Sequence, residues 1–247
     1  MVVEEVKPYN EEESKREQVE ALFDNIASTY DKANHQMSLG IDVCWRRSAI
    51  KKLQKLSNMP YRILDVATGT GDLAIMTRKA FHHALHITGI DISEGMMKVG
   101  RQKVAAQGMS DSISFQYEDC SKLSFADNSF DAIISSFALR NFENIDICLK
   151  EMCRVMDKGG SIVVIDLCAP RKFPMKQVFG IYRNYIMPIY GRLVSKDEKA
   201  FRYLPETMDA IQQGEGMKER FERAGFESVE FKYLSFGMCV MYSGLKK

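Results

Sequence analysis

The chain has 247 residues. It contains 34 lysines and arginines and 33 aspartates and glutamates, so its formal charge is +1. A balance this close to neutral gives no overall field that favours nucleic acid, and we expect no nucleic-acid partner. The length and the hydrophobic fraction of 45% suit one α/β domain with its own core. The polar start is unlike a signal peptide, and no apolar run approaches the roughly 20 residues that cross a bilayer. We therefore expect a cytoplasmic protein.

Neither the cysteines nor the histidines of the chain suggest a metal site. No two of the six cysteines form a CxxC pair, which predicts reduced thiols. His82, His83 and His86 lie between a predicted helix and a predicted strand, without a cysteine or carboxylate at ligand spacing. We predict that the protein holds no metal.

The first quarter of the chain is predicted to be mostly helical. Residues 1–13 are acidic and polar, which favours a disordered tail ahead of a domain that spans 14–247. Apolar side chains at three- and four-residue spacing predict a helix over 14–27. Residues 28–42 read as a loop or broken helix, and a basic amphipathic helix follows to Leu56. Residues 14–58 together are expected to form an N-terminal lid.

From Tyr61 onward, short apolar runs alternate with helical patterns, which predicts a parallel, doubly wound sheet. The predicted strands lie at 61–66, 86–91, 113–118, 130–136 and 161–167. The helices between them are predicted at about 72–82, 93–107 and 144–156. Two later strands, at 228–234 and 238–245, are close enough for a hairpin, so one of them should be antiparallel. Five parallel strands followed by a hairpin are typical of the Rossmann-like, seven-stranded sheet of class I methyltransferases.

Residues 169–225 interrupt this alternation. They hold four of the six prolines together with many aromatic and methionine side chains. The segment is too long for a simple crossover between strands. We predict that it forms a helical cap over the carboxyl edge of the sheet.

The segment Ile63–Asp72, which includes Asp65 and Thr70, lies between a predicted strand and a predicted helix and is the strongest local signal. Gly69 and Gly71 allow the backbone to turn sharply and to approach a ligand closely. A dinucleotide loop reads GxGxxG, but the residue three after Gly71 is Ala74. Asp72 at the start of the helix would repel a phosphate and suits an ammonium or sulfonium group. These features favour S-adenosylmethionine over a dinucleotide.

The ends of the next three predicted strands carry polar groups that suit the same ligand. Asp91 follows Gly71 by 20 residues, where a carboxylate accepts hydrogen bonds from ribose hydroxyls or caps the next helix. Asp119 and Cys120 suit an adenine ring, and main-chain groups at Ser136 suit the methionine moiety. Because parallel strands end at one edge, these groups should line one crevice.

Five segments together resemble the ubiquinone/menaquinone biosynthesis C-methyltransferase family, UbiE/MenG. They are 23–47, 63–74, 88–97, 137–146 and 151–170. The resemblance implies cofactor contacts at Thr70, Asp91, Asp119, Cys120 and Ser136. It implies a demethylated polyprenyl quinol as substrate, methylated on a ring carbon, with 2-demethylmenaquinol favoured. The chain departs from the family pattern at Ala33, Asp42, Asp166 and Cys168.

A carbon nucleophile requires the quinol to lose a phenolic proton, so the site needs a base and a group that stabilises the phenolate. We assign Arg140 to stabilising the phenolate or to positioning a water that carries the proton. Asn141 is assigned to orienting the ring oxygen or that water, and Asp166 is the candidate base, directly or through water. Arg140 could instead pair with Glu143, and Asp166 could cap a turn. Tyr30 is expected to close over the cofactor and to bind its methionine carboxylate, or else to pack on the sheet.

Several questions stay open at this stage. The apolar side chains of the cap either line a channel for the prenyl tail or form ordinary core; they are Phe173, Met175, Phe179, Ile181, Tyr182, Ile186, Met187 and Tyr190. The acceptor is otherwise the ubiquinone precursor or another small molecule. A nicotinamide-dependent oxidoreductase and a non-catalytic cofactor-binding scaffold are the alternatives from other classes. Peripheral contact with the inner face of a membrane and a homodimer are both left open.

Overall fold

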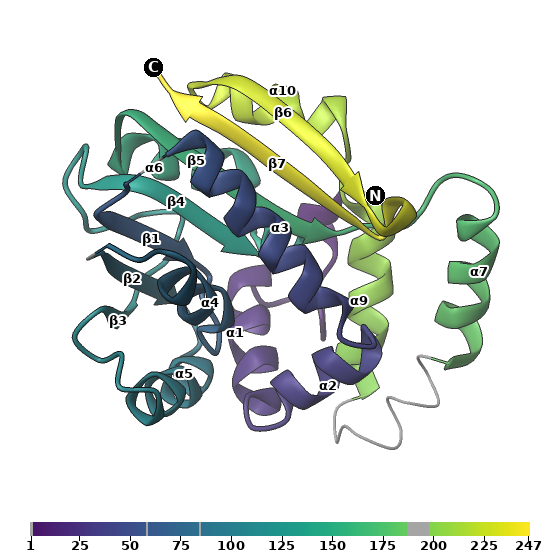
Figure 1. Cartoon of the computed structure of the whole chain (residues 1–247). Helices are drawn as coiled ribbons and strands as arrows, with labels where there is room; N and C mark the ends of the chain where they lie inside the picture. The colour runs from purple at the N-terminus through teal and green to yellow at the C-terminus, as the bar shows by residue number, and fades with distance from the viewer. Residues whose placement is uncertain (1, 58, 84, 187–197) are drawn as a thin grey trace.

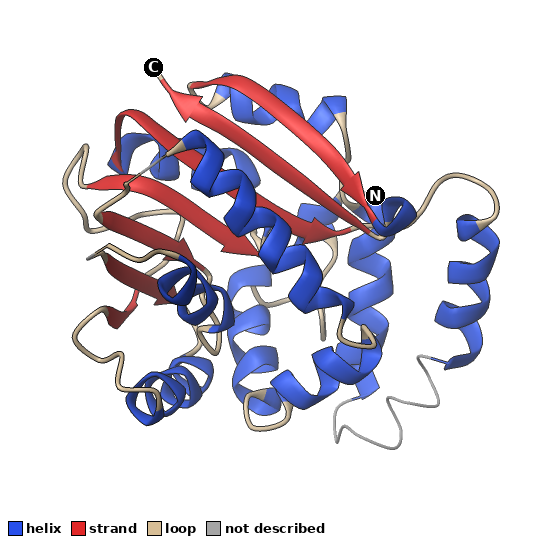
Figure 2. Cartoon of the chain, in the orientation of Figure 1, coloured by secondary structure: helices blue, strands red, loops and turns tan. Residues whose placement is uncertain are grey.

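The computed structural model describes residues 2–57, 59–83, 85–186 and 198–247, and it centres on one seven-stranded sheet (Figure 2). The strand order is β3-β2-β1-β4-β5-β7-β6, and β7 runs antiparallel to both of its neighbours. The predicted methyltransferase-type sheet, with one antiparallel strand from the final hairpin, is confirmed. The strands are β1 (Arg62–Val66), β2 (His86–Asp91), β3 (Ile113–Tyr117), β4 (Phe130–Ser136), β5 (Met156–Leu167), β6 (Phe226–Leu234) and β7 (Cys239–Lys246).

Helices cover both faces of the sheet because its central strands are apolar on both sides. The last four residues of β1 are buried, as are seven consecutive residues of β5 up to Asp166. One face packs against α3 (Ile41–Leu56), α4 (Asp72–Ala80) and the end of α5 (Glu94–Ala106). The other face packs against α6 (Ile145–Val155) and α10 (Glu215–Arg223). This layering leaves the carboxyl ends of the parallel strands open to other elements.

The N-terminal segment is ordered, so the prediction of a disordered tail over 1–13 was wrong. A short 3-10 turn, η1 (Val3–Glu5), places Val3 in the main core, where its side chain is 1% exposed. The Lys15 Nζ atom donates to the Val3 carbonyl oxygen at 2.6 Å, and Glu4 pairs with Arg220 at 2.5 Å. Two buried valines, Val3 and Val6, therefore anchor a segment that its acidic composition alone would leave in solvent.

The region predicted as a loop or broken helix over 28–42 contains a helix. The helix α1 (Lys15–Ile26) is capped by Ser14, whose side chain forms a capping box with Glu17. It is followed by α2 (Tyr30–Met37) and, after Gly40 with a positive φ of 75°, by α3. In Figure 1, α1 and α2 lie at the end of the sheet toward which the parallel strands point.

The segment 169–225 divides into two structural parts, so the prediction of a single helical cap was only partly correct. Its first elements, α7 (Met175–Ile181), the π-helical turn η3 (Tyr182–Ile186) and α9 (Glu198–Ala210), lie beyond the carboxyl edge of the sheet (Figure 1). The final helix, α10, instead covers a face of the sheet, because Met217 and Phe221 are fully buried in the main core. None of the helices in the described ranges is long and apolar enough to cross a bilayer.

Adjacent valines at the N-terminus allow a direct test of the ordered segment. Val3→Ala removes buried methyl groups and should lower the free energy of unfolding by about 2 kcal/mol. Val2, which is 54% exposed, supplies the control, and Val2→Ala should leave stability almost unchanged. Denaturant titration of the two variants measures both values, and equal effects would show that the segment is not packed in the core.

Candidate active site

Two cavities adjoin one another beyond the carboxyl ends of the strands. The first, called here the strand-end cavity, has a volume of about 370 Å³ and is bordered by the loops that follow β1, β2, β3 and β4. The second, the aromatic cavity, has a volume of about 140 Å³ and is enclosed by α1, α2, α3, η2 (Leu139–Asn141), α7, η3 and α9. Both cavities are therefore formed by elements that meet at the same edge of the sheet.

Asp91, at the end of β2, lies on the wall of the strand-end cavity together with Gly69. Its Oδ2 accepts a hydrogen bond from the Gly69 N–H at 2.8 Å, and its Oδ1 accepts one from the Ser93 N–H at 2.9 Å. Burial disfavours the charged carboxylate and raises its pKa to about 6. Asp91 thus holds the glycine loop and the start of α5 around the cavity.

Asp119, after β3, lines the same cavity with Cys120, and Ser136 lines it from the end of β4. Arg16 of α1 donates from Nε to Asp119 Oδ2 at 2.5 Å, and Ser121 N–H donates to Oδ1 at 2.8 Å. Burial alone would raise the pKa of Asp119, but these hydrogen bonds outweigh it and hold the pKa below its ordinary value. The sequence analysis missed Arg16, because 103 residues separate it from Asp119.

Two residues of the glycine loop that were predicted to bind the cofactor do not line the strand-end cavity. Asp65 is buried beneath the loop, where its Oδ2 accepts a hydrogen bond from Thr68 Oγ1 at 2.8 Å. Gly71 has a φ of 78°, and a Cβ atom there would lie 2.9 Å from the Phe115 ring. Asp65 and Gly71 therefore fix the shape of the glycine loop from its buried side, while Gly69 lies on the cavity wall.

Thr70 and Asp72 also point away from the strand-end cavity, toward the lid. Thr70 Oγ1 donates to Asp31 Oδ1 of α2 at 2.6 Å, and Lys103 Nζ of α5 contacts Asp31 Oδ2 at 2.7 Å. Lys103 also pairs with Asp72. The inference that Asp72 faces a cationic ligand was therefore wrong, since a lysine already neutralises it. The cluster fastens α2 to the glycine loop.

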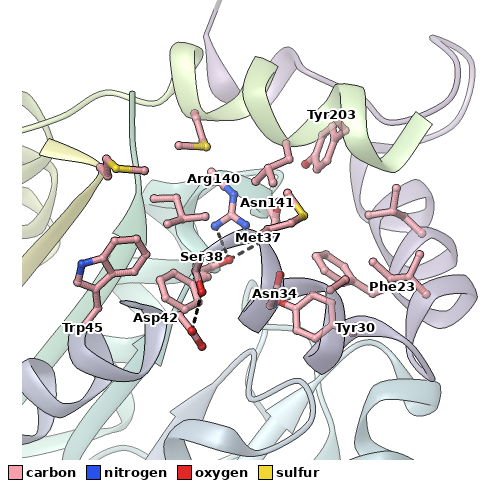
Figure 3. Close-up of a pocket in the computed structure, with 18 of the residues that line it drawn as sticks. Phe23, Tyr30, Asn34, Met37, Ser38, Asp42, Trp45, Arg140, Asn141 and Tyr203 are labelled. Carbon is pink, nitrogen blue, oxygen red and sulfur yellow. Dashed lines mark hydrogen bonds between the residues drawn. The ribbon is translucent and has the colours of Figure 1, made fainter. Parts of the chain in front are cut away.

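The aromatic cavity is largely apolar, and Figure 3 shows its side chains converging from several helices. A cavity of roughly 150 Å³ admits a small aromatic compound, so this space has the size of an aromatic head group rather than of a long chain. Its lining includes Leu22, Phe23, Ile26, Tyr30, Trp45, Phe137, Leu167, Phe179, Tyr182, Tyr203, Leu204 and Met208.

Arg140 reaches the aromatic cavity from η2, whereas Asp166 is enclosed behind it. The two side chains form a buried ion pair, and Asp166 accepts further hydrogen bonds from the N–H groups of Arg140 at 2.9 Å and Leu167 at 2.7 Å. Asp166 has no exposed surface and is absent from the cavity wall. In this arrangement Asp166 positions Arg140, and its assignment as the base stays a prediction that its enclosure does not favour. Glu143 does not pair with Arg140 but accepts from Lys15 N–H.

Three polar atoms that belong to residues lining the aromatic cavity are buried without a hydrogen-bond partner within the described structure. They are Nε of Arg140, Oδ1 of Asn141 and the hydroxyl oxygen of Tyr203. Buried polar groups normally find partners because leaving them unpaired costs about 1–3 kcal/mol. One N–H donor, one carbonyl acceptor and one hydroxyl in an apolar pocket are suited to a ligand that carries its own hydroxyl groups.

Four residues line both cavities: Phe23, Tyr30, Phe137 and Asn141. Tyr30 lies at this junction from α2, with its ring against Phe23 at a centroid distance of 5.8 Å. Burial raises the pKa of its phenol, so Tyr30 stays neutral. These four side chains therefore form the boundary that the two cavities share.

Asp42 lies on the wall of the aromatic cavity. Among the described residues that line this cavity, it is the one with a carboxylate side chain. Ser38 Oγ donates to its Oδ1 at 2.7 Å, while Arg46 and His35 contact its Oδ2 at 2.5 and 2.8 Å. Burial alone would raise the pKa of Asp42, but the hydrogen bond from Ser38 and the charge of Arg46 outweigh it and lower the pKa. Asp42 is therefore ionised at neutral pH.

Of the eight cap residues considered for a prenyl channel, Phe179 and Tyr182 line the aromatic cavity. Phe173 and Ile181 are 82% and 59% exposed, so they do not form an enclosed channel. Met175 is half-buried and does not border the cavity. The side chain of Ile186, and Met187 and Tyr190 altogether, lie outside the described residues.

Comparison with known proteins identifies the family. A model of the ubiE/COQ5 methyltransferase family matches residues 11–246. The chain belongs to this family. It is 51% identical over 98% of each chain to a demethylmenaquinone methyltransferase of Bacteroides fragilis, and 41% identical over 98% of each chain to one of Porphyromonas gingivalis. A SAM-dependent methyltransferase from Thermotoga maritima, described as a possible histamine N-methyltransferase, shares the fold with a TM-score of 0.63 at 18% identity, covering 93% of this chain and all of its own.

Membership in the family makes the protein a methyltransferase, and the oxidoreductase and scaffold hypotheses are set aside. The methyltransferase fold explains why one sheet edge carries two cavities. Strand ends provide polar groups for one ligand, and the helices placed beyond them enclose another. The two cavities are thus suited to a methyl donor and a methyl acceptor.

The buried carboxyl group of Asp65 gives a pH-dependent prediction. Burial raises its pKa from 3.8 to about 7, because the folded protein disfavours the charged carboxylate. The free energy of unfolding therefore falls as the pH rises from about 4 through 7, where the unfolded chain loses this proton more readily than the folded protein does. Asp65→Asn should therefore stabilise the protein at pH 8, on the order of 3 kcal/mol, and less at pH 5. Thermal melts at both pH values measure this, with the exposed Asp111→Asn as control. An equal shift at the two pH values would contradict the prediction.

Proposed function

We propose that the protein transfers the methyl group of S-adenosylmethionine to a ring carbon of a demethylated polyprenyl quinol, with 2-demethylmenaquinol as the substrate. The observation that carries this proposal is the junction of a strand-end cavity with a ring-sized cavity that presents unpartnered polar groups. The names of the two relatives from Bacteroides fragilis and Porphyromonas gingivalis support demethylmenaquinone as the acceptor. The SAM dependence ascribed to the Thermotoga maritima methyltransferase supports the cofactor.

The groups that line the strand-end cavity fit the cofactor chemically. Asp91 keeps a further lone pair on each oxygen for ribose hydroxyls, and Asp119 with the Cys120 backbone suits the adenine edge. Gly69 and Ser136 border the part assigned to the methionine moiety, which Tyr30 closes. When bound, S-adenosylmethionine supplies an electrophilic methyl group on a sulfonium. The protein contributes alignment of that group with the aromatic cavity.

Arg140 and Asn141 are suited to hold one ring hydroxyl of the acceptor. The Arg140 Nε–H is a free donor to the ring oxygen, and the Asn141 Oδ1 is a free acceptor that can orient the hydroxyl before its O–H bond rotates toward Ser38. The guanidinium charge lowers the pKa of such a hydroxyl and stabilises the phenolate that forms. Asp166 keeps the guanidinium in place through their ion pair. An electron-rich ring carbon next to the phenolate then becomes the nucleophile. Its bond to the methyl group would form as the methyl–sulfur bond breaks, and loss of the hydrogen from that carbon as a proton would restore the aromatic quinol.

Ser38 and Asp42 are suited to receive the phenolic proton, because both line the aromatic cavity and Asp166 does not. The acceptor O–H bond breaks, and the electron pair stays on the ring oxygen. The proton passes to Ser38 Oγ as the Ser38 proton moves to Asp42 Oδ1 along their 2.7 Å hydrogen bond. Because Asp42 is ionised at neutral pH, it is in the state that accepts a proton.

A direct assay tests the reaction and the acceptor together. Purified protein with methyl-labelled S-adenosylmethionine should convert 2-demethylmenaquinol to a product with one added methyl group on ring carbon, identified by mass spectrometry and NMR. The demethylated ubiquinone precursor serves as the second acceptor, and preferred turnover of it would replace the proposed substrate. Methylation of neither quinol, or methylation on oxygen, would contradict the proposed function.

Ser38→Ala tests the proton path without disturbing the Asp42–Arg46 pair. The variant should lower kcat by about 100-fold and leave the affinity for S-adenosylhomocysteine unchanged, because the hydroxyl that carries the proton is lost. Ser38→Thr retains a hydroxyl and should recover part of the rate. Ser48→Ala, which removes a hydroxyl from α3 outside both cavities, is the matched control. Wild-type turnover by Ser38→Ala would remove Ser38 and Asp42 from the path.

A further inference from the structure

Large apolar side chains are exposed along one outer face of α7 and η3. Val178 is 52%, Ile181 59% and Tyr185 68% exposed, and Phe173 just before the helix is 82% exposed. Spacings of three and four residues place the first three on one side of the helix. Phe179 and Tyr182, on the adjacent side, line the aromatic cavity. Figure 1 shows α7 at the rim of the molecule, outside α2 and α9. Its apolar surface is thus wider than the part that the protein covers.

Other exposed apolar side chains lie on segments that border the same cavity. Leu39, which is 87% exposed, follows the cavity-lining residues Met37 and Ser38, and the Tyr182 hydroxyl donates to the Met37 carbonyl oxygen at 3.0 Å. Phe236, which is 83% exposed, lies in the turn η4 (Ser235–Gly237) beside the cavity-lining Met238. The rim of the aromatic cavity is therefore apolar on several sides.

The same segment carries positive charge and no acidic residue. Between Asp166 and Asp197 the sequence contains no Asp or Glu and six cations: Arg171, Lys172, Lys176, Arg183, Arg192 and Lys196. Arg171, Lys172 and Lys176 are exposed on the described part, while Arg183 pairs with Asp209. We call Arg171, Lys172, Phe173, Lys176, Val178, Ile181 and Tyr185 the α7 face. This combination of apolar and basic side chains complements an anionic lipid surface.

The size of the aromatic cavity adds a separate reason for a lipid surface at this rim. Its volume of about 140 Å³ accommodates a ring but not a long prenyl chain. If the acceptor is a polyprenyl quinol, as proposed above, its tail must leave the cavity through the apolar rim. A bilayer at the rim would keep that tail out of water, which an aqueous surface would not do.

We propose that the α7 face docks the protein on an anionic bilayer, with Val178, Ile181, Tyr185 and Phe173 entering the interface and the basic side chains contacting headgroups. The acceptor ring then enters the aromatic cavity directly from the membrane while its tail stays in lipid. The docking rests on the surface itself, whereas the route of the acceptor rests on the proposed function.

Vesicle binding with matched variants tests the docking surface. The purified full chain is floated with vesicles of neutral phosphatidylcholine or of phosphatidylcholine with anionic phosphatidylglycerol. Wild type should float with the anionic vesicles, and Val178→Glu/Tyr185→Glu should reduce binding at least tenfold. The matched control is Met59→Glu/Tyr61→Glu, at sites that are 71% and 60% exposed beside the opposite end of β1. This control should bind as wild type does. Lys172→Gln/Lys176→Gln should weaken binding to the anionic vesicles.

Three results would overturn the proposal. The first is that the wild type binds neither kind of vesicle. The second is that the control variant loses as much binding as Val178→Glu/Tyr185→Glu does. The third is that sedimentation shows a wild-type dimer that Val178→Glu/Tyr185→Glu converts to a monomer, because this result would assign the face to self-association. Activity with an acceptor whose tail is short enough to dissolve in water separates this test from the proposed function. The α7 double variant should retain that activity. Vesicle binding without methylation of any quinol would leave the docking surface standing and reject the reaction.

Discussion

The buried ion pair between Arg140 and Asp166 is the interaction on which the arrangement of the site depends. Arg140 is 6% exposed and Asp166 is fully buried, so removal of either partner would leave an uncompensated charge, at a cost of about 3–5 kcal/mol. The pair joins η2 to the end of β5, and Arg140 Nη1 also donates to the Phe137 carbonyl oxygen at 2.6 Å. On the other side, Lys15 Nζ donates to the Arg140 carbonyl oxygen at 2.8 Å and ties η2 to the N-terminal segment.

This packing explains why a lysine is buried near the site. Lys15 is 1% exposed, and burial lowers its pKa to about 8. Its ammonium group is satisfied by two carbonyl oxygens, those of Val3 and Arg140. The ordered N-terminus, the turn η2 and the end of β5 therefore form one connected unit. The lid adds a second connection, because Asp31 of α2 contacts both Thr70 and Lys103.

A polar ligand and an apolar ligand need cavities with different linings, and in this fold different elements provide the two linings. Strand ends and their loops carry carboxylates and backbone groups, which suit a polar nucleoside. The helices beyond them carry aromatic and aliphatic side chains, which suit a ring with an apolar tail. Phe23, Tyr30, Phe137 and Asn141 border both spaces, so alignment across this boundary and exclusion of water there come from the same side chains.

The sequence alone determined the sheet, its single antiparallel strand and the strand-end groups at Asp91, Asp119 and Ser136, because hydrophobic periodicity and strand-end chemistry are local in the chain. It could not show that the acidic N-terminus is held by Val3, or that Arg16 pairs with Asp119, since these contacts join distant segments. Burial decided the role of Asp166: a carboxylate at a strand end becomes a base or a positioning group according to what encloses it. Only the tertiary structure showed that Arg140 encloses Asp166 while Asp42 faces the cavity.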